Sequence, residues 1–160
     1  MSSKTPSFKQ LLSNPVQMLA FGFGSGLSKK APGTMGTLVA IPFYYYLSQS
    51  FEYLYLPVLV LVIVSGVWIC GKAANDIGVH DHGGIVWDEI AGYLLTMYWV
   101  SFSWQNVIFG FILFRLFDIA KPWPINWLDS KVKGGFGIMV DDLLAGLMSA
   151  ACLYGVTFII

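Results

Sequence analysis

The run YLYLPVLVLVIVSGVWICG, residues 53–71, contains no charged side chain over nineteen positions. A helix of this length rises about 28 Å at 1.5 Å per residue, close to the roughly 30 Å hydrocarbon thickness of a bilayer. A second uncharged run, residues 143–160, lies at the lower limit of the length that a membrane span needs. The two runs predict membrane-spanning helices and place the fold in the all-α class.

The composition of the whole chain also indicates a bilayer as its solvent. Hydrophobic residues make up 56% and charged residues 11%, whereas soluble domains contain about 25% charged residues. The length of 160 residues predicts a single domain, residues 1–160. Nine basic residues balance nine acidic ones, so the chain lacks the basic surplus that a nucleic-acid partner requires. The sequence leaves the oligomeric state open.

Three other regions are less regular. Residues 35–51 are uncharged and contain Pro42, which fits the first turns of a helix that opens near Thr37. Residues 90–114 are interrupted by the polar stretch 101–106, which predicts two short helices that meet at a tight turn. In total we expect a polytopic membrane protein with about four to five apolar helices. Residues 7–21 break at an Asn-Pro pair and are either an interfacial helix or a loose tail.

The charges mark the two sides of the predicted bundle. Of the charged residues, only Glu52 lies in the predicted turns near 48–54 and 101–106. All nine lysines and arginines lie in residues 1–36, 72–89 and 115–142. The positive-inside rule makes that side cytoplasmic. This predicts a multi-pass protein of a bacterial inner membrane, with its N-terminus inside, its C-terminus outside and a polar site that faces the cytoplasm.

Acidic residues lie where the apolar runs begin or end. Asp88 and Glu89 precede one run, Asp118 follows the next, and Asp141 and Asp142 are expected to open the last helix. A single acid at a helix start is explained by capping and the helix dipole. Capping and the helix dipole do not explain pairs of acids at two helix starts or an acid near a helix end. Ionisable groups at the ends of membrane helices indicate function.

Glycines predict that these acids converge. Asp88 and Gly92 are four residues apart, as are Asp142 and Gly146, so each carboxylate shares a helix face with a glycine. Small residues let membrane helices approach closely. Several carboxylates brought together repel each other and need a cation, and an all-oxygen group of ligands favours Mg²⁺ or Mn²⁺.

Basic and small residues nearby indicate a phosphate site. Arg115 is three residues from Asp118 and either pairs with it or binds phosphate, and Lys121 follows three residues later. Residues 29–37 form a Gly/Thr loop that runs into a helix, whose free amides suit an anion. His80 and His82 flank Asp81 and are either acid–base or metal-binding groups or solvated histidines. Residues 134–137, Gly-Gly-Phe-Gly, predict a flexible loop.

Four segments together resemble the phosphatidylglycerophosphatase A family. They are residues 33–37 (GTMGT), 80–92 (HDHGGIVWDEIAG), 114–125 (FRLFDIAKPWPI) and 134–146 (GGFGIMVDDLLAG). The resemblance implies a mostly helical membrane enzyme with a cytoplasmic-facing site. It further implies Mg²⁺-dependent hydrolysis of phosphatidylglycerophosphate to phosphatidylglycerol and inorganic phosphate, a step of phospholipid biosynthesis.

On this basis each candidate residue is assigned a role as a hypothesis. Asp88, Glu89, Asp141 and Asp142 hold one or two Mg²⁺ ions. Phosphate oxygens are bound by Thr34, Thr37, Arg115 and Lys121. The candidate catalytic residues are Asp118, Asp142, Glu89 and His82, with Asp118 as a further ligand or as the base that orients water.

Other chemistries lack their residues in this sequence. Cys70 and Cys152 lie in apolar runs without the phosphate loop of a cysteine phosphatase. The DxDx(T/V) motif of haloacid dehalogenase-type enzymes and the KxxxxxxRP motif of histidine-based lipid phosphatases are absent. Metal-assisted hydrolysis remains, with a covalent aspartyl intermediate as an open alternative. A headgroup transferase is the enzymatic alternative, and a small transporter is the alternative from another class.

Overall fold

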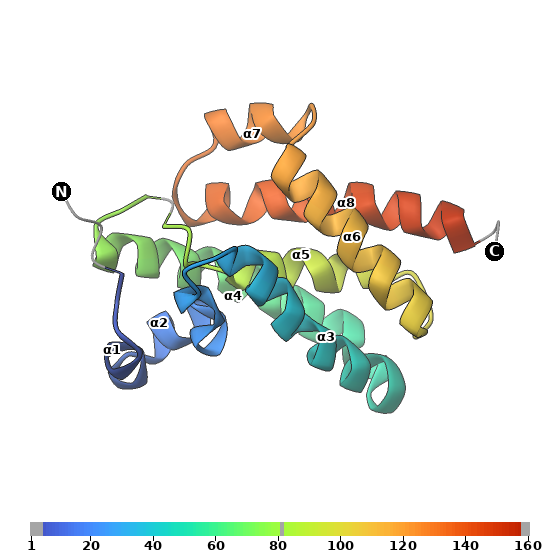
Figure 1. Ribbon diagram of the computed structural model, residues 1–160, viewed down its shortest axis with the longest axis horizontal. Coiled ribbons are helices and arrows are strands. Elements are labelled where there is room, and N and C mark those ends of the chain that lie inside the picture. The colour runs from blue at the N-terminus through green and yellow to red at the C-terminus, as the bar shows by residue number, and fades with distance from the viewer. Residues whose placement is uncertain (1–4, 81, 158–160) are drawn as a thin grey trace.

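The computed structural model describes residues 5–80 and 82–157, and these residues are helical with short connections (Figure 1). The elements, in chain order, are α1 (Phe8–Ser13), α2 (Pro15–Ala20), the 3₁₀ helix η1 (Gly22–Leu27), α3 (Pro32–Ser50), α4 (Glu52–Ile77), α5 (Trp87–Met97), α6 (Trp104–Ala120), α7 (Ile125–Lys131) and α8 (Gly134–Thr157). The all-α prediction is therefore confirmed. Successive helices among α3, α4, α5, α6 and α8 point in opposite directions along the molecule.

Local sequence signals explain several helix ends. Asn14 ends α1, and its side chain accepts a hydrogen bond from the amide of Gln17 to cap α2, where Pro15 occupies the first position. The Ser103 hydroxyl accepts a hydrogen bond from the Asn106 amide and caps α6. The expected break in residues 7–21 and the two helices within residues 90–114 are both confirmed.

Helix α5 lies at the centre of the bundle. It packs against α3, α4, α6 and α8, and none of its side chains is exposed. The hydroxyls of two buried core tyrosines donate hydrogen bonds to backbone carbonyls. Tyr55 donates to the carbonyl of Leu94 at 2.8 Å, and Tyr93 donates to that of Val107 at 3.2 Å. The first turn of α5 carries Asp88 and Glu89, so these acids are fixed to the most enclosed helix.

Two helix starts differ from the sequence prediction. Helix α8 begins at Gly134, so Asp141 and Asp142 lie inside it rather than at its start. A Cβ at Gly135 would lie 2.8 Å from the backbone nitrogen of Gly71 in α4. The predicted flexible loop over residues 134–137 is therefore wrong, because these residues are helical and Gly135 packs against the backbone of α4. Helix α3 begins at Pro32, before Thr37, since proline is well suited to a first helical turn.

Two helices, α4 and α8, are long and apolar enough to cross a membrane. In the 18-residue apolar window of α4 only 28% of the residues are buried inside the protein. Leu61 and Val64, for example, are each 65% exposed. The bundle thus presents a broad apolar surface, which is a typical mark of an interaction with lipid or protein.

Candidate active site

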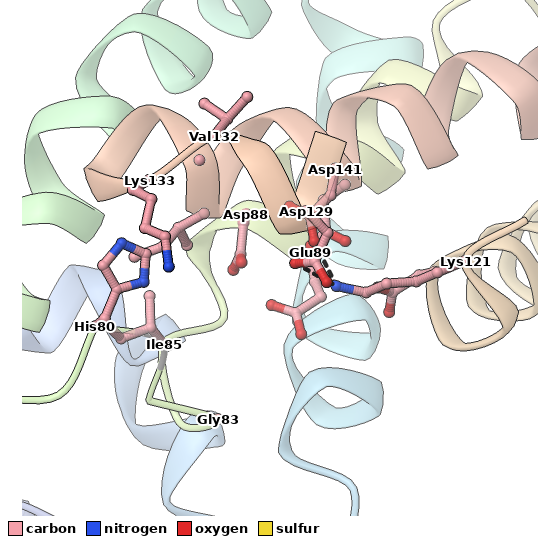
Figure 2. Close-up of a pocket in the computed structure, with 14 residues that line it drawn as sticks. His80, Gly83, Ile85, Asp88, Glu89, Lys121, Asp129, Val132, Lys133 and Asp141 are labelled. Atoms are coloured by element: carbon pink, nitrogen blue, oxygen red, sulfur yellow. Dashed lines mark hydrogen bonds and ion pairs between the residues drawn. The ribbon is translucent and has the colours of Figure 1, made fainter. Parts of the chain in front are cut away.

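A polar cavity of about 260 Å³ opens at the end of the bundle where α5 and α8 begin (Figure 2). Carboxylates dominate its lining. The acidic lining residues are Asp88, Glu89, Asp118, Asp129, Asp141 and Asp142, and the remaining polar side chains are those of His80, Lys121 and Lys133. The structure therefore gathers all the predicted acidic residues in one pocket.

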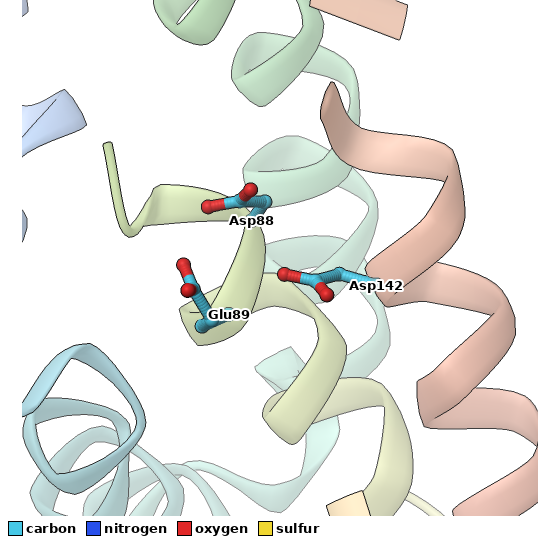
Figure 3. A group of neighbouring side chains, drawn as sticks. All are labelled: Asp88, Glu89 and Asp142. Atoms are coloured by element: carbon cyan, nitrogen blue, oxygen red, sulfur yellow. The ribbon is translucent and has the colours of Figure 1, made fainter. Parts of the chain in front are cut away.

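Three carboxylates form the centre of this pocket (Figure 3). Asp88 and Glu89 from α5 and Asp142 from α8 each place a carboxylate oxygen within 4.8 Å of the others. The close helix contact predicted at Gly92 and Gly146 is confirmed, and it brings these carboxylates together. A Cβ at Gly146 would lie 2.5 Å from the carbonyl oxygen of Gly92, so the two helices meet at backbone contact.

These carboxylates have the properties of cation ligands. Among the described residues, Asp88 Oδ1 and Glu89 Oε2 are buried and have no hydrogen-bond partner. Leaving buried charged oxygens without a hydrogen-bond partner is costly, and the three neighbouring carboxylates repel one another. A hard divalent cation with oxygen ligands resolves both problems, so the residues present fit Mg²⁺.

Asp141 faces a different partner from the other predicted ligands. Its Oδ2 lies 2.7 Å from the Nζ of Lys121, which also lies 3.0 Å from Asp129 Oδ1. Burial lowers the pKa of Lys121, but the hydrogen bonds and charges of Asp141 and Asp129 outweigh it and hold the pKa above its usual value. Lys121 therefore stays charged and links the end of α6 to α7 and α8.

Arg115 lies between two acids. Its Nη1 forms an ion pair with Asp118 Oδ2 and lies 4.0 Å from Glu89 Oε1. Asp118 also interacts electrostatically with Glu89 and Asp142. The ion pair that the three-residue spacing allowed is thus present. Among the described residues the Nε of Arg115 is buried without a partner, and Arg115 is not among the residues that line the pocket.

The start of α3 adjoins the carboxylates. A Cβ at Gly33 would lie 3.1 Å from Arg115 Nη1 and would collide with Glu89 Oε1, so a larger residue there would displace these two side chains. The first amides of a helix have no partner within it, and those of α3 lie at this point. Thr34 is half-buried in the same turn. The buried Thr37 hydroxyl donates to the carbonyl of Gly33 at 2.9 Å.

The two histidines occupy different surroundings. His80 lines the pocket, and its Nε2 accepts a hydrogen bond from the Gly134 amide at 2.7 Å. His82 is 9% exposed, packs against the Phe21 ring and accepts from the Gly84 amide at its Nδ1. His82 is not among the residues that line the pocket, and its catalytic role stays a prediction. Asp81 lies outside the described residues.

Two charged residues of the pocket were not predicted from the sequence. Asp129 lies in α7, and Lys133 lies just before α8. Both are ordinary charged residues in a polar segment, so no local pattern singles them out. They reach the pocket because α7 folds back beside α8 (Figure 1).

The chain is similar to known proteins of one family. The family model of phosphatidylglycerophosphatase A matches residues 18–157. Phosphatidylglycerophosphatase A of Escherichia coli (strain K12) is 52% identical over 144 residues, which cover 89% of this chain and 84% of that protein. Its counterpart in Haemophilus influenzae is 42% identical over 160 residues, which cover 99% of this chain and 98% of that protein. No solved structure matches the chain.

The helical fold, the carboxylate pocket and these relatives define the protein as a phosphatase, a hydrolase of phosphoric monoesters. More specifically, the chain belongs to the phosphatidylglycerophosphatase A family. The resemblance noted in the sequence is thereby confirmed.

Proposed function

We propose that this protein uses Mg²⁺ to hydrolyse phosphatidylglycerophosphate to phosphatidylglycerol and inorganic phosphate in bacterial phospholipid biosynthesis. The observation that carries the proposal is the group formed by Asp88, Glu89 and Asp142. Glu89 of this group lies next to Arg115 and to Gly33 at the start of α3, so groups that suit a cation and groups that suit a phosphate are neighbours. The names of the relatives in E. coli and H. influenzae supply the substrate.

The metal would be held by Asp88, Glu89 and Asp142. Asp141 also lines the pocket and forms an ion pair with Lys121. When bound, Mg²⁺ would neutralise charge on the phosphate and make a nearby water more acidic. Asp88 Oδ1 and Glu89 Oε2, which have no hydrogen-bond partner among the described residues, are oxygens that could bind the ion.

The remaining residues position the phosphate and the attacking water. The guanidinium of Arg115 and the first amides of α3 bind phosphate oxygens. Asp118, which is held by its ion pair with Arg115, accepts a proton from the attacking water while the water oxygen forms a bond to phosphorus. The bond between phosphorus and the glycerol oxygen breaks, and that oxygen takes up the proton that Asp118 accepted, which makes it the hydroxyl of phosphatidylglycerol and regenerates the carboxylate.

We place this site at the cytoplasmic face of the inner membrane, with α4 and α8 crossing the bilayer and α3, α5 and α6 packed with them. The exposed apolar face of α4 supports this placement. Exposed aromatic residues, typical of membrane interfaces, occur near both ends: Tyr53 at the start of α4 is 77% exposed, and Trp123 near the pocket is 78% exposed. The headgroup would enter the pocket while the acyl chains stay in the bilayer.

Protein purified in detergent is expected to release phosphate from phosphatidylglycerophosphate about a hundredfold faster with Mg²⁺ than with EDTA, because the pocket needs a cation to accept an anion. Malachite green detection of phosphate measures the rate. Restoring Mg²⁺ after EDTA should restore the rate and so exclude denaturation by the chelator. Folded protein that releases no phosphate with Mg²⁺ would disprove the proposed reaction.

The orientation is testable with single cysteines in a Cys152→Ser background, since Cys70 is buried. Ser130→Cys on α7 and Gln49→Cys at the opposite end both replace exposed residues. In spheroplasts, a membrane-impermeant maleimide is expected to label Gln49→Cys but to label Ser130→Cys only after lysis. Labelling of Ser130→Cys in intact spheroplasts would place the pocket outside.

A further inference from the structure

The pocket has a second basic end that the proposed mechanism does not use. Figure 2 shows Lys121 and Asp141 on one side of the pocket and His80 and Lys133 on the other, with Asp88 between them. Asp88 and Glu89, assigned above to the cation, lie between these two sides. The His80 side therefore needs its own explanation.

The two lysines of the pocket differ in their charge balance. Lys121 is paired with both Asp129 and Asp141. No ion pair involves Lys133 within residues 5–80 and 82–157. In a pocket lined mainly by acids, an ammonium without a paired carboxylate is available to a ligand anion.

His80 adds a donor beside Lys133. Its Nε2 accepts from the Gly134 amide, so the ring proton lies on Nδ1 and that nitrogen donates. The bond also joins the loop after α4 to the first residue of α8 and fixes the ring in place. Lys133 precedes this same residue, and the opening turn of α8 adds partial positive charge next to both side chains.

We propose that Lys133 and His80 form a second anion subsite, which binds the phosphodiester of the lipid headgroup while the terminal phosphate lies at the carboxylates. This inference rests on the proposed function. Phosphatidylglycerophosphate carries a monoester and a diester on one glycerol, so two anions enter the pocket together. A cavity of about 260 Å³ is smaller than the roughly 300–1,000 Å³ typical of drug-sized ligands, which suits a headgroup without its acyl chains.

The subsite makes the enzyme selective for phosphate esters that carry a second, diester phosphate. Binding energy from this non-reacting phosphate positions the reacting one. The comparison that isolates this effect uses two soluble substrates in neutral detergent with saturating Mg²⁺. Glycerophosphoglycerophosphate, the deacylated lipid, has both phosphates, and glycerol 3-phosphate has only the monoester.

Wild-type protein is expected to show a higher kcat/KM for glycerophosphoglycerophosphate than for glycerol 3-phosphate. Lys133→Ala should reduce this ratio about tenfold, the usual effect of losing one hydrogen bond to a charged group, and should leave the rate on glycerol 3-phosphate unchanged. Lys133→Arg should restore most of the ratio. Lys131→Ala is the matched control, because Lys131 is an exposed lysine of α7 outside the pocket lining.

Three outcomes would overturn the inference. The first is an unchanged ratio in Lys133→Ala, and the second is an equal loss on both substrates, which indicates a general role. The third is a loss that appears only when anionic phosphatidylglycerol is added to the micelles, which would assign Lys133 to a neighbouring lipid. If wild-type protein hydrolyses neither the lipid nor its deacylated form, the proposed function itself fails.

Discussion

Asp142→Asn is expected to lower phosphate release from phosphatidylglycerophosphate by on the order of 10²–10³-fold or more, the range found when one preorganised electrostatic group is removed from an active site. Asparagine keeps the shape of the side chain but removes one of the three charges that converge on the cation site. Asp88 and Glu89 then remain to hold Mg²⁺ by themselves. Raising the Mg²⁺ concentration should recover only part of the lost rate.

The same substitution should not weaken the fold. Asp142 is only 3% exposed and lies among other carboxylates, so removing its charge relieves repulsion when no metal is bound. The thermal unfolding midpoint of the variant in EDTA is therefore expected to equal or exceed that of the wild type. Asp76→Asn is the matched control, because Asp76 pairs with Lys72 on α4 away from the pocket. Near-wild-type activity in Asp142→Asn would exclude Asp142 from the site.

Gly146→Ala is expected to reduce activity at least about tenfold and to destabilise the protein by about 1–3 kcal/mol, the usual cost of overpacking. The added Cβ would lie 2.5 Å from the carbonyl oxygen of Gly92. That oxygen belongs to backbone, so α5 and α8 must separate. The carboxylates of Asp88 and Asp142 move apart with them, and misplacement of about 1 Å is enough for a large loss of rate.

Gly155→Ala provides a matched control on the same helix. Among residues 5–80 and 82–157, no atom outside its own stretch of helix lies within 4 Å of the position that its Cβ would occupy, so only the higher helix propensity of alanine should matter. Phosphate release and thermal unfolding in detergent measure both variants. If Gly146→Ala and Gly155→Ala behave alike, the backbone contact does not set the carboxylate geometry.

Much of the helical framework follows from local sequence. The uncharged run at residues 53–71 lies inside α4, and the polar interruption at 101–106 covers the end of the connection between α5 and α6 and the first turn of α6. Capping by Asn14 and Ser103 is equally local. Glycine runs carry no such information, because glycine serves both loops and close helix contacts. For that reason the sequence predicts that Asp141 and Asp142 open the last helix, whereas α8 begins at Gly134.

Part of the candidate site also follows from the sequence, and part depends on the tertiary structure. Residue type and the four-residue spacing of Asp88 with Gly92 and of Asp142 with Gly146 predict converging carboxylates and a close helix contact, since both follow from the period of one helix.

Only the tertiary structure shows which acids meet. Asp141 and Asp142 are neighbours in sequence but differ by about 100° around the axis of α8. The glycine contact turns Asp142 toward Asp88 and Glu89, and it leaves Asp141 facing Lys121. The position of α7 then brings Asp129 and Lys133 to the pocket. These features depend on the rotation and packing of helices against each other, which no single segment encodes.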